Sequence, residues 1–363
     1  MSIFRDFFVK EKPVFTGITR GVGGFGFGKA AGGETGPPGP TWEVTLLASR
    51  TTSGTAYPSV SQKRDGTRIF ISQNDRTIVY SDNDGSTWSG VSGFSAGIYG
   101  TRIYTFANTN KMVAATHGSN YGKIYYSSNN GASWSEKVNT GDSIYKGYHN
   151  PDTGLIMLGD RGAAGSASSD LNRSTDFGNS WSVALDSNQS DHIGPGVVQN
   201  GSGSGLTGFT WSNSLFWTTS NSGASWSSQT APTNHVFSSS SGVWYKSDNS
   251  IFVYKGGNQT VLTGTTPTGA RTVVDLSSTI TGNILIMEKD ADDVFYLGTN
   301  QGYLYYSTDD GTTWESVPGW DDVYDNFGTG QLTGIHTDNA DNRFLVVTSE
   351  GSSVTKVWSL TKS

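Results

Sequence analysis

The amino-acid sequence predicts an all-β fold built from a repeated four-stranded unit, and three observations support this prediction. Glycine accounts for 48 of the 363 residues, nearly double its usual share, and only 15% of the residues are charged. Aromatic residues make up 12% of the chain. The third observation is an eight-residue motif that recurs along the sequence. Many tight turns between aromatic-rich strands are typical of β-sheet proteins.

The recurring motif, which we call the box motif, has the form Ser/Thr-x-Asp/Asn-x-Gly-x-Ser/Thr-Trp. It occurs five times, with the third and eighth positions filled by Asn83 and Trp88, Asn129 and Trp134, Asp176 and Trp181, Asn221 and Trp226, and Asp309 and Trp314. Successive Trp residues are 46, 47, 45 and 88 residues apart. The last spacing is two periods, so one copy has decayed near residues 263–270.

Each copy of the box motif follows a run of β-branched and aromatic residues, such as 123–126 or 303–306. The motif is therefore predicted to form a hairpin turn. The Asp or Asn side chain accepts backbone N–H groups, Gly supplies a positive φ, and Trp begins the next strand. These ten residues are assigned a structural role.

A period of about 45 residues with four short strands predicts the blade of a β-propeller. Trp42 lies 46 residues before Trp88, and 272 residues separate Trp42 from Trp314, which gives seven blades. The chain ends with only three strands, so the strand after Trp42 is expected to complete the last blade and to leave no open sheet edge. Six blades is the alternative, if residues 235–282 hold one irregular blade and a loop.

At its box motifs the sequence resembles the Asp-box (bacterial neuraminidase repeat, BNR) β-propellers. The resemblance covers about residues 39–363, although only Asp176 and Asp309 keep the Asp of the third position. It implies the propeller fold. The same turn occurs in sialidases, xyloglucanases, sorting receptors and a photosystem II assembly factor, so the fold does not choose the function.

Catalytic motifs are sparse. A sialidase of this family would need an arginine triad, a Tyr–Glu pair and an acidic proton donor, and the Phe/Tyr-Arg-Ile-Pro motif of its first arginine is absent. The nearest matches contain Arg68 and Arg102, which are expected in turns or stacked on neighbours. A generic glycosidase needs only two carboxylates, so it stays open as an alternative. The five His have no metal-ligand spacing and Cys is absent, so neither metal nor cofactor is expected.

Charge and hydropathy exclude several partners. The net charge of −7 gives no electrostatic footprint for nucleic acid. No apolar run reaches the ~20 residues of a membrane helix, so membrane insertion is not expected. Charged residues interrupt the first 13 positions, which therefore do not read as a secretory signal peptide.

The loops on the propeller face opposite the box turns are expected to bind ligands, in particular sugars. Aromatic rings beside acidic hydrogen-bond acceptors are what a sugar-binding surface requires. The candidates are Trp320, Asp321, Asp322, Tyr324, Asp325 and Phe327 in the longest such loop, with Tyr121 and Arg161 from two others. Packing of these loops over the channel is the alternative interpretation.

Residues 1–38 do not fit the repeat and are predicted to form a docking peptide ahead of the propeller at 39–363. This segment contains six Phe residues, too many for a chain this short to bury alone: Phe4, Phe7, Phe8, Phe15, Phe25 and Phe27. Residues 7–13 and the Gly/Phe run at 21–28 resemble the anchoring peptides of virion structural proteins in tailed, particularly marine, phages.

This second resemblance implies a phage virion structural or adhesion protein, assembled in the host cytoplasm and located in the virion. Residues 1–38 would attach it to other virion proteins, and the propeller would bind host-surface glycan or neighbouring virion proteins. The alternative is a virion-associated glycoside hydrolase on the same scaffold. A third hypothesis, an assembly factor like the photosystem propeller, explains the fold but leaves the Phe-rich segment unexplained.

Overall fold

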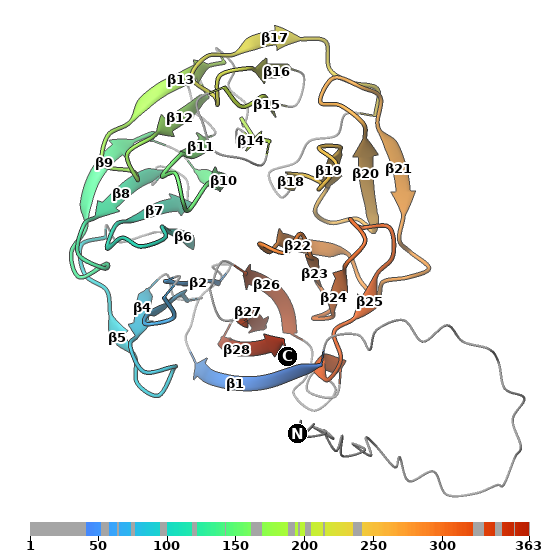
Figure 1. The fold of residues 1–363 in the computed structure, drawn as a ribbon. Helices are drawn as coiled ribbons and strands as arrows, with labels where there is room; N and C mark the ends of the chain where they lie inside the picture. The colour runs from blue at the N-terminus through green and yellow to red at the C-terminus, as the bar shows by residue number, and fades with distance from the viewer. Residues whose placement is uncertain are drawn as a thin grey trace, which may run out of the picture. The chain divides into compact units, whose positions relative to one another are not determined.

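The structure, a computed structural model, is a β-propeller of seven four-stranded antiparallel sheets arranged around a channel (Figure 1). The chain divides into two compact units, Met1–Gly39 and Pro40–Ser363, and the propeller is the second. The structure describes residues 41–51, 58–63, 65–73, 77–94, 100–117, 122–141, 143–160, 169–187, 193–194, 197–199, 205–212, 215–234, 242–321, 330–337, 343–351 and 353–362.

The first four blades follow one another along the chain, and their strands run from the channel outward. Blade 1 holds β2 (Ser59–Gln62), β3 (Ile69–Ser72), β4 (Ile78–Ser81) and β5 (Ser89–Gly90). Blade 2 holds β6 (Gly100–Thr105), β7 (Met112–His117), β8 (Lys123–Ser127) and β9 (Ser135–Asn139). Blade 3 holds β10 (Ile144–His149), β11 (Ile156–Asp160), β12 (Asp170–Ser174) and β13 (Ser182–Asp186). Blade 4 holds β14 (Val197–Val198), β15 (Gly208–Trp211), β16 (Phe216–Thr219) and β17 (Ser227–Gln229).

The remaining three blades complete the ring. Blade 5 holds β18 (Gly242–Tyr245), β19 (Ile251–Tyr254), β20 (Thr260–Gly264) and β21 (Thr272–Asp275). Blade 6 holds β22 (Ile284–Lys289), β23 (Phe295–Thr299), β24 (Leu304–Ser307) and β25 (Glu315–Ser316). Blade 7 holds β26 (Gly330–His336), β27 (Arg343–Glu350), β28 (Val354–Lys362) and β1 (Trp42–Thr51).

The predicted closure of the ring is confirmed. β1 pairs antiparallel with β28, from Trp42 opposite Lys362 to Thr51 opposite Val354, and Figure 1 shows the blue β1 lying along the red β28. The six-blade alternative is wrong, because residues 242–275 form the complete sheet of blade 5.

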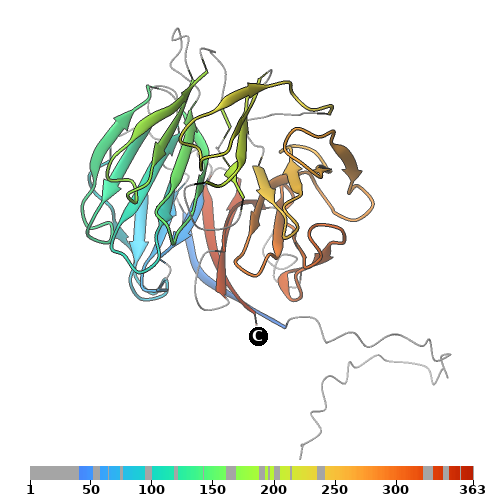
Figure 2. The ribbon, with the colours of Figure 1, turned by 45° about the horizontal axis from the view of Figure 1, so that its top comes forward.

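Burial follows the position of each strand within its blade. Second strands such as β3, β11 and β23 are buried along their whole length, because neighbouring blades cover both faces of the sheet. Outer strands such as β5 and β17 are exposed and carry small or polar residues. The oblique view of Figure 2 shows the sheets standing side by side around the ring, so the core consists of the layers between adjacent blades.

The five box motifs form turns with a shared hydrogen-bond pattern. In the first turn, Gly85 N donates to Ser81 Oγ at 2.9 Å and Thr87 N donates to Asn83 Oδ1 at 2.9 Å. Both bonds recur in the other four turns. The fourth and fifth motif positions are left-handed, with φ of 54° at Asp84 and 81° at Gly85. Two successive left-handed residues reverse the chain within the motif, which is why Gly is needed at its fifth position.

Asp and Asn are interchangeable at the third position because the turn uses the side chain as a hydrogen-bond acceptor. In the third turn, burial alone would raise the pKa of Asp176. Hydrogen bonds from Ser180 and Ser174 to the carboxylate outweigh this effect, and the pKa lies below its usual value. The neutral amide of Asn129 accepts the same backbone hydrogen bond in the second turn.

Each box turn also attaches its blade to the preceding blade. A Cβ atom on Gly178 would lie 2.0 Å from Val113 in β7, and a Cβ on Gly311 would lie 2.5 Å from the ring of Phe252 in β19. The Gly of each turn is therefore required by this contact as well as by its φ. Polar contacts add to the attachment, as where Asp84 in the first turn pairs with Arg343 of blade 7 at 2.7 Å.

The box Trp packs on the same neighbour. Trp314 lies against Phe252 of blade 5, with ring centroids 6.3 Å apart, and Trp134 packs with the core cluster around Phe70 of blade 1. Trp42 at the start of β1 takes the equivalent place in blade 7, because its ring meets Tyr296 and Tyr306 of blade 6 edge-on at 6.1 Å. Trp42 keeps the repeat interval of the box Trp residues because it occupies the equivalent packing position in its blade.

Blade 5 carries the decayed copy of the motif, and Arg271 replaces its Trp. Arg271, just before β21, lies seven positions after Gly264 at the end of β20, as Trp88 lies seven positions after Ser81. Arg271 is 4% exposed and donates to the carbonyl oxygens of Thr266, Pro267 and Gly269 at 3.1, 2.9 and 3.3 Å. Its guanidinium lies 5.9 Å from the ring centroid of Phe209 in blade 4. Burial lowers the pKa of Arg271 to about 10.

We expect the change Arg271→Ala to lower the free energy of unfolding by about 2–4 kcal/mol. The change removes the donor to three turn carbonyls and leaves a cavity beside Phe209. Urea denaturation measures the effect, with Lys137→Ala on the exposed outer strand β9 as a control that stays within about 0.5 kcal/mol of the unchanged chain. Equal stability of the two variants would show that Arg271 does not hold the turn.

Closure by β1 predicts a sharp difference between two truncated chains. A chain that begins at Pro40 keeps β1 and should unfold cooperatively at the melting temperature of the full chain. A chain that begins at residue 52 exposes the edge of β28 and should aggregate or lose cooperative unfolding. Calorimetry and size-exclusion chromatography distinguish these results. A soluble, cooperative chain beginning at residue 52 would contradict the role of β1.

Candidate functional site

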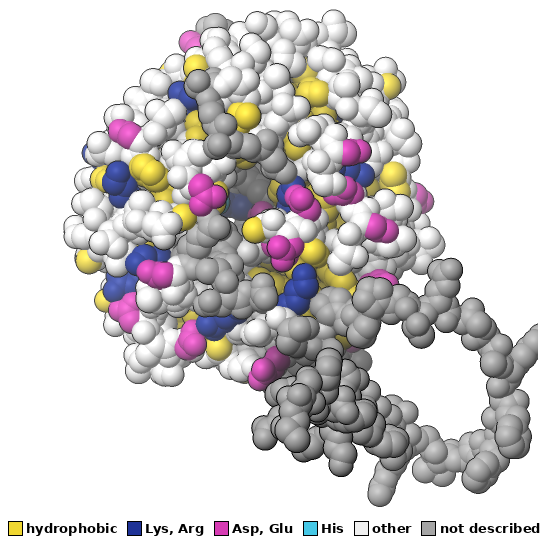
Figure 3. Space-filling view, viewed as in Figure 1, with side chains coloured by type: hydrophobic (Ala, Val, Ile, Leu, Met, Phe, Trp, Pro, Cys, Tyr) yellow, Lys and Arg dark blue, Asp and Glu magenta, His cyan; other side chains and the backbone are white. Residues whose placement is uncertain are grey.

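The innermost strands of the blades surround a central cavity of about 350 Å³. Its lining comes from β2, β6, β10, β14, β18, β22 and β26 and from the loops after β10, β22 and β26. Figure 3 shows one face of the propeller with a hollow at its centre, and acidic and basic side chains lie near the rim of this hollow. The volume is in the range of a small-ligand pocket, enough to hold one or two amino-acid side chains.

The cavity reaches toward the end of the channel that carries the box turns. In an antiparallel four-stranded blade, the loop between strands one and two lies at the same end as the loop between strands three and four. The loops between strands one and two contribute to the lining Asn150 and Asp152 in blade 3, Asp290 in blade 6 and Thr337 in blade 7. The loops of the opposite face, where the sequence predicts ligand binding, do not supply these residues. Six of the candidates predicted there lie outside the described residues and stay predictions: Tyr121, Arg161, Asp322, Tyr324, Asp325 and Phe327.

Trp320 does not offer a ring to a ligand, which corrects the sequence-based expectation. Its side chain is 1% exposed and belongs to the core cluster between blades 6 and 7. The indole Nε1 donates to Gly302 O at 2.9 Å, and the ring meets Trp358 edge-on at 5.7 Å. Asp321 beside it is partly buried. The alternative interpretation, loop packing, therefore describes Trp320.

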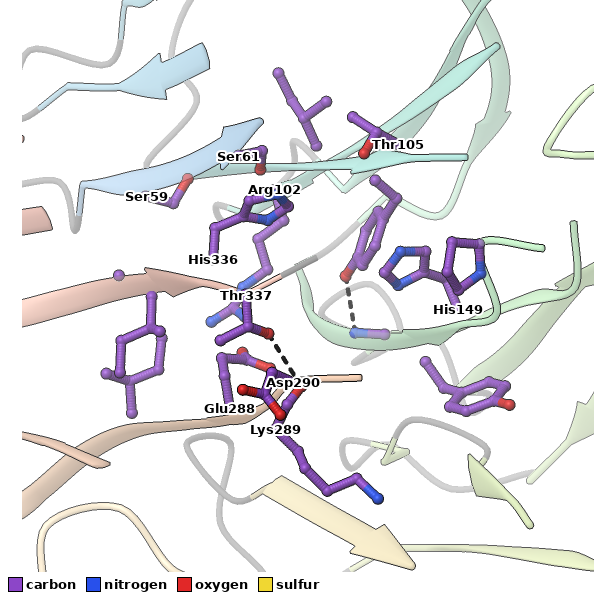
Figure 4. A pocket seen from close by; sticks show the side chains of 18 of the residues that line it. Ser59, Ser61, Arg102, Thr105, His149, Glu288, Lys289, Asp290, His336 and Thr337 are labelled. Carbon is purple, nitrogen blue, oxygen red and sulfur yellow. Dashed lines mark hydrogen bonds between the residues drawn. The ribbon is translucent and has the colours of Figure 1, made fainter. Parts of the chain in front are cut away.

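Two opposite charges face each other across the cavity, Arg102 on β6 and Glu288 on β22. Figure 4 shows the Arg102 side chain reaching toward Glu288. Burial raises the pKa of Tyr104 beside them to about 12, and the charges of Arg102 and Glu288 act on it in opposite directions. Within the part of the chain that the structure describes, no hydrogen bond or ion pair holds the Arg102 guanidinium. Arg102 thus contributes a positive charge to the cavity lining.

Arg102 lies on the channel wall, and not in a turn or stacked on a neighbour as the sequence predicts. Arg68 does stack as expected, because its guanidinium lies 4.2 Å from the ring centroid of Tyr80 and pairs with Asp82 at 2.6 Å. The two residues sit in similar tetrapeptides. Only their strands differ, because Arg102 is on an innermost strand and Arg68 precedes a second strand.

Two other ionic groups of the cavity hold the loop after β22. Asp290 accepts hydrogen bonds from Val294 N, Asp292 N and Tyr296 Oη, each at 2.9 Å. Burial raises the pKa of Asp290, and these bonds oppose the rise. Lys289 donates to Asp293 at 2.6 Å and to Tyr245 O at 3.0 Å. Both side chains are thus committed to local structure.

Hydrogen bonds between neighbouring innermost strands fix the wall of the cavity. Thr105 Oγ1 of blade 2 donates to Gln62 O of blade 1 at 3.0 Å. Gly147 N of blade 3 donates to Tyr104 Oη of blade 2 at 2.9 Å, and Thr337 Oγ1 of blade 7 donates to Lys289 O of blade 6 at 3.0 Å (Figure 4). The described residues contain no group of three His, Asp or Glu side chains that could hold a metal ion. Bonds between blades therefore hold the cavity wall in place, and its charged lining residues are Arg102, Asp152, Glu288, Lys289 and Asp290.

Fold and site together define a seven-bladed box-turn β-propeller with a ligand-sized central channel. The chain belongs to the family described as photosynthesis system II assembly factor YCF48, whose model matches residues 24–329. None of the curated proteins compared matches the chain. The described residues contain no helix long and apolar enough to cross a membrane.

Solved structures share the fold at low sequence identity. A structure titled "YCF48 bound to D1 peptide" aligns with a TM-score of 0.54 at 14% identity, covering 87% of this chain and 96% of that one. YCF48 from Cyanidioschyzon merolae aligns at 0.56 and 12% identity, covering 88% and 98%. An inactive virginiamycin B lyase from Staphylococcus aureus, with quinupristin, aligns at 0.59 and 16% identity, covering 88% and 99%. These likenesses support the propeller fold alone.

The expectation of a phage virion protein is wrong, and so is the virion localisation. The family match places the chain in a family of assembly factors, and two of the solved structures named above are YCF48 proteins. Virion partners and surface glycan are likewise unsupported. The resemblance to BNR-type propellers is confirmed, whereas the phage-anchor resemblance of residues 1–38 finds no support. The third hypothesis, a propeller assembly factor, is the one that agrees with the family.

Proposed function

We propose that this protein is a protein-binding assembly factor that holds a peptide segment of its partner in the central channel. Family membership over residues 24–329 supports an assembly role. A structural neighbour is titled as YCF48 bound to a D1 peptide, so a propeller of this family binds a peptide. The observation that carries the proposal to this chain is the Arg102 guanidinium, which faces the cavity without an ion pair among the described residues.

The chemistry of Arg102 fits a peptide carboxylate, from an acidic side chain or a chain end. A guanidinium binds a carboxylate through two parallel hydrogen bonds, and such charge-assisted bonds are stronger than neutral ones. The wall around Arg102 is fixed by bonds between adjacent blades, so little order has to be imposed on binding. The same cavity commits Asp290 and Lys289 to its own loop. We therefore favour binding over catalysis.

We also propose that residues 1–38 form a docking peptide separate from the propeller at 39–363. The proposal rests on sequence: six Phe residues in a Gly-rich segment offer apolar anchors for a protein partner. Ordering such a chain costs about 1–2 kcal/mol per residue, so several anchors are needed together. If the segment were part of the propeller core, the truncated chain that begins at Pro40 would melt at a lower temperature.

Binding of D1 peptides tests the channel proposal. We expect at least one fluorescein-labelled peptide from a set tiling the D1 sequence to bind the full chain, measured by fluorescence anisotropy. Arg102→Ala should weaken this binding at least about tenfold, because a charge-assisted pair is lost. Lys137→Ala, which removes an exposed cation on outer strand β9, should leave it unchanged.

Two results would contradict the proposed function. Either no D1 peptide binds the unchanged chain, or Arg102→Ala binds the peptide as tightly as the unchanged chain does. Arg102→Lys is the conservative variant, and it should bind with intermediate affinity because it keeps the charge and loses the two-pronged geometry. Melting temperatures equal to that of the unchanged chain establish that the variants are folded.

A further inference from the structure

The wall of the channel is not uniform, and its composition restricts what can bind. Among the described residues, the cavity lining from β14 and β18 consists of Val197, Val243 and Trp244, none of them charged. The charged lining residues come from β6, from β22 and from the loops after β10 and β22. The cavity therefore has an apolar wall from blades 4 and 5, and charged side chains from blades 2, 3 and 6.

Trp244 is the large side chain of the apolar wall, and its neighbours fix its position. The indole stacks on Tyr254 with centroids 5.8 Å apart and planes at 18°, and it meets Phe295 of blade 6 edge-on at 6.0 Å. A Cβ atom on Gly242, two residues earlier on the same face of β18, would lie 2.4 Å from the Tyr254 ring and 2.8 Å from the indole. Glycine at this position lets the two rings lie flat against the strand. Trp244 is only partly buried and lines the cavity, and its contacts with Tyr254 and Phe295 hold the indole ring in place.

Trp244 lines the same cavity as Arg102 and Glu288. The hydroxyl of Tyr254, whose ring stacks on the indole, is buried, and this burial raises its pKa. The charge of Glu288 raises it further and the charge of Arg102 lowers it, so both groups lie within electrostatic range of the Tyr254 hydroxyl. Arg102 and Trp244 line one cavity of about 350 Å³, so a single ligand can contact both.

We propose that the channel selects a ligand residue in which a large apolar side chain adjoins a carboxylate, the side chain packing on Trp244 and the carboxylate pairing with Arg102. This inference rests on the proposed function and specifies the residue that the channel holds. Apolar contact supplies affinity in such a cavity, and the charge pair fixes the orientation of the ligand. Glu288, which faces Arg102, disfavours a second carboxylate through like-charge repulsion.

Three small probes separate the two contributions in the full chain: N-acetyl-L-leucine, N-acetylglycine and N-acetyl-L-leucinamide. We expect N-acetyl-L-leucine to bind about tenfold or more tightly than N-acetylglycine, because only the first fills the space against Trp244. N-acetyl-L-leucinamide, which lacks the carboxylate, should lose at least about tenfold against N-acetyl-L-leucine. Isothermal titration calorimetry with competition, or ligand-observed NMR for weak probes, gives these ratios.

Variants assign the selectivity to Trp244. Trp244→Ala should bring N-acetyl-L-leucine to the affinity of N-acetylglycine while leaving N-acetylglycine unchanged, and Trp244→Phe should keep most of the preference. Arg102→Ala should weaken both carboxylate probes equally. Val273→Ala, which removes a side chain 52% exposed on outer strand β21, is the matched control and should change nothing. If the Ala variant does not fold, the ratio of the N-acetyl-L-leucine and N-acetylglycine affinities in the unchanged chain still tests the inference.

The inference is overturned if N-acetyl-L-leucine and N-acetylglycine bind equally, if neither binds, or if Trp244→Phe and Trp244→Ala both keep the full preference. Its failure is distinguishable from that of the proposed function. D1 peptide binding that depends on Arg102 but not on Trp244 would leave the proposed function intact and overturn this inference. Selective probe binding without D1 peptide binding would support this inference about the channel and contradict the proposed function.

Discussion

The contact between each box turn and the preceding blade is the interaction on which the rest of the structure depends. The turn places a left-handed glycine against a core side chain of its neighbour, as Gly178 does against Val113, and its Trp packs on the same blade. Hydrophobic packing between blades is non-directional, so by itself it does not set the angle between two blades. A turn that fits one point of the next sheet does set that angle. The innermost strands, and with them Arg102 and Trp244, take their positions from this ring.

Arg271 shows that the contact matters more than the residue that makes it. Where the motif has decayed, the arginine fills the place of the indole, satisfies the turn carbonyls and reaches the ring of Phe209 in the preceding blade. Glycine at position 264 makes room for Arg271, because a Cβ atom there would lie 2.9 Å from the guanidinium. The ring thus tolerates a different turn so long as the turn stays attached to its neighbour.

Local features could be predicted from the sequence, and features set by the closed ring could not. The period of Trp88, Trp134 and their equivalents gave the blade count and the role of β1, because each turn is encoded in eight consecutive residues. Arg102 was assigned wrongly, because a strand sequence does not reveal which of its residues face a channel formed by seven strands. Trp320 was assigned to the surface because loop sequence alone does not show that a ring is 1% exposed.

The functional prediction failed for a related reason. It relied on the pattern of Phe and Gly in residues 1–38, a short stretch of biased composition that many unrelated proteins can share. The family match extends over residues 24–329 and so draws on most of the propeller. A resemblance that covers blades 1 to 6 carries more information than one confined to a Gly-rich segment, and it overturns the virion hypothesis.

The central claim is that the channel, and not the outer surface of the blades, is where this protein binds its partner. Hydrogen exchange of the full chain with and without a bound D1 peptide tests this claim most directly. We expect slower exchange in β6 and β22 on binding, with the exposed outer strands β9 and β13 unchanged. Slower exchange confined to the outer strands, with none in β6 or β22, would contradict it.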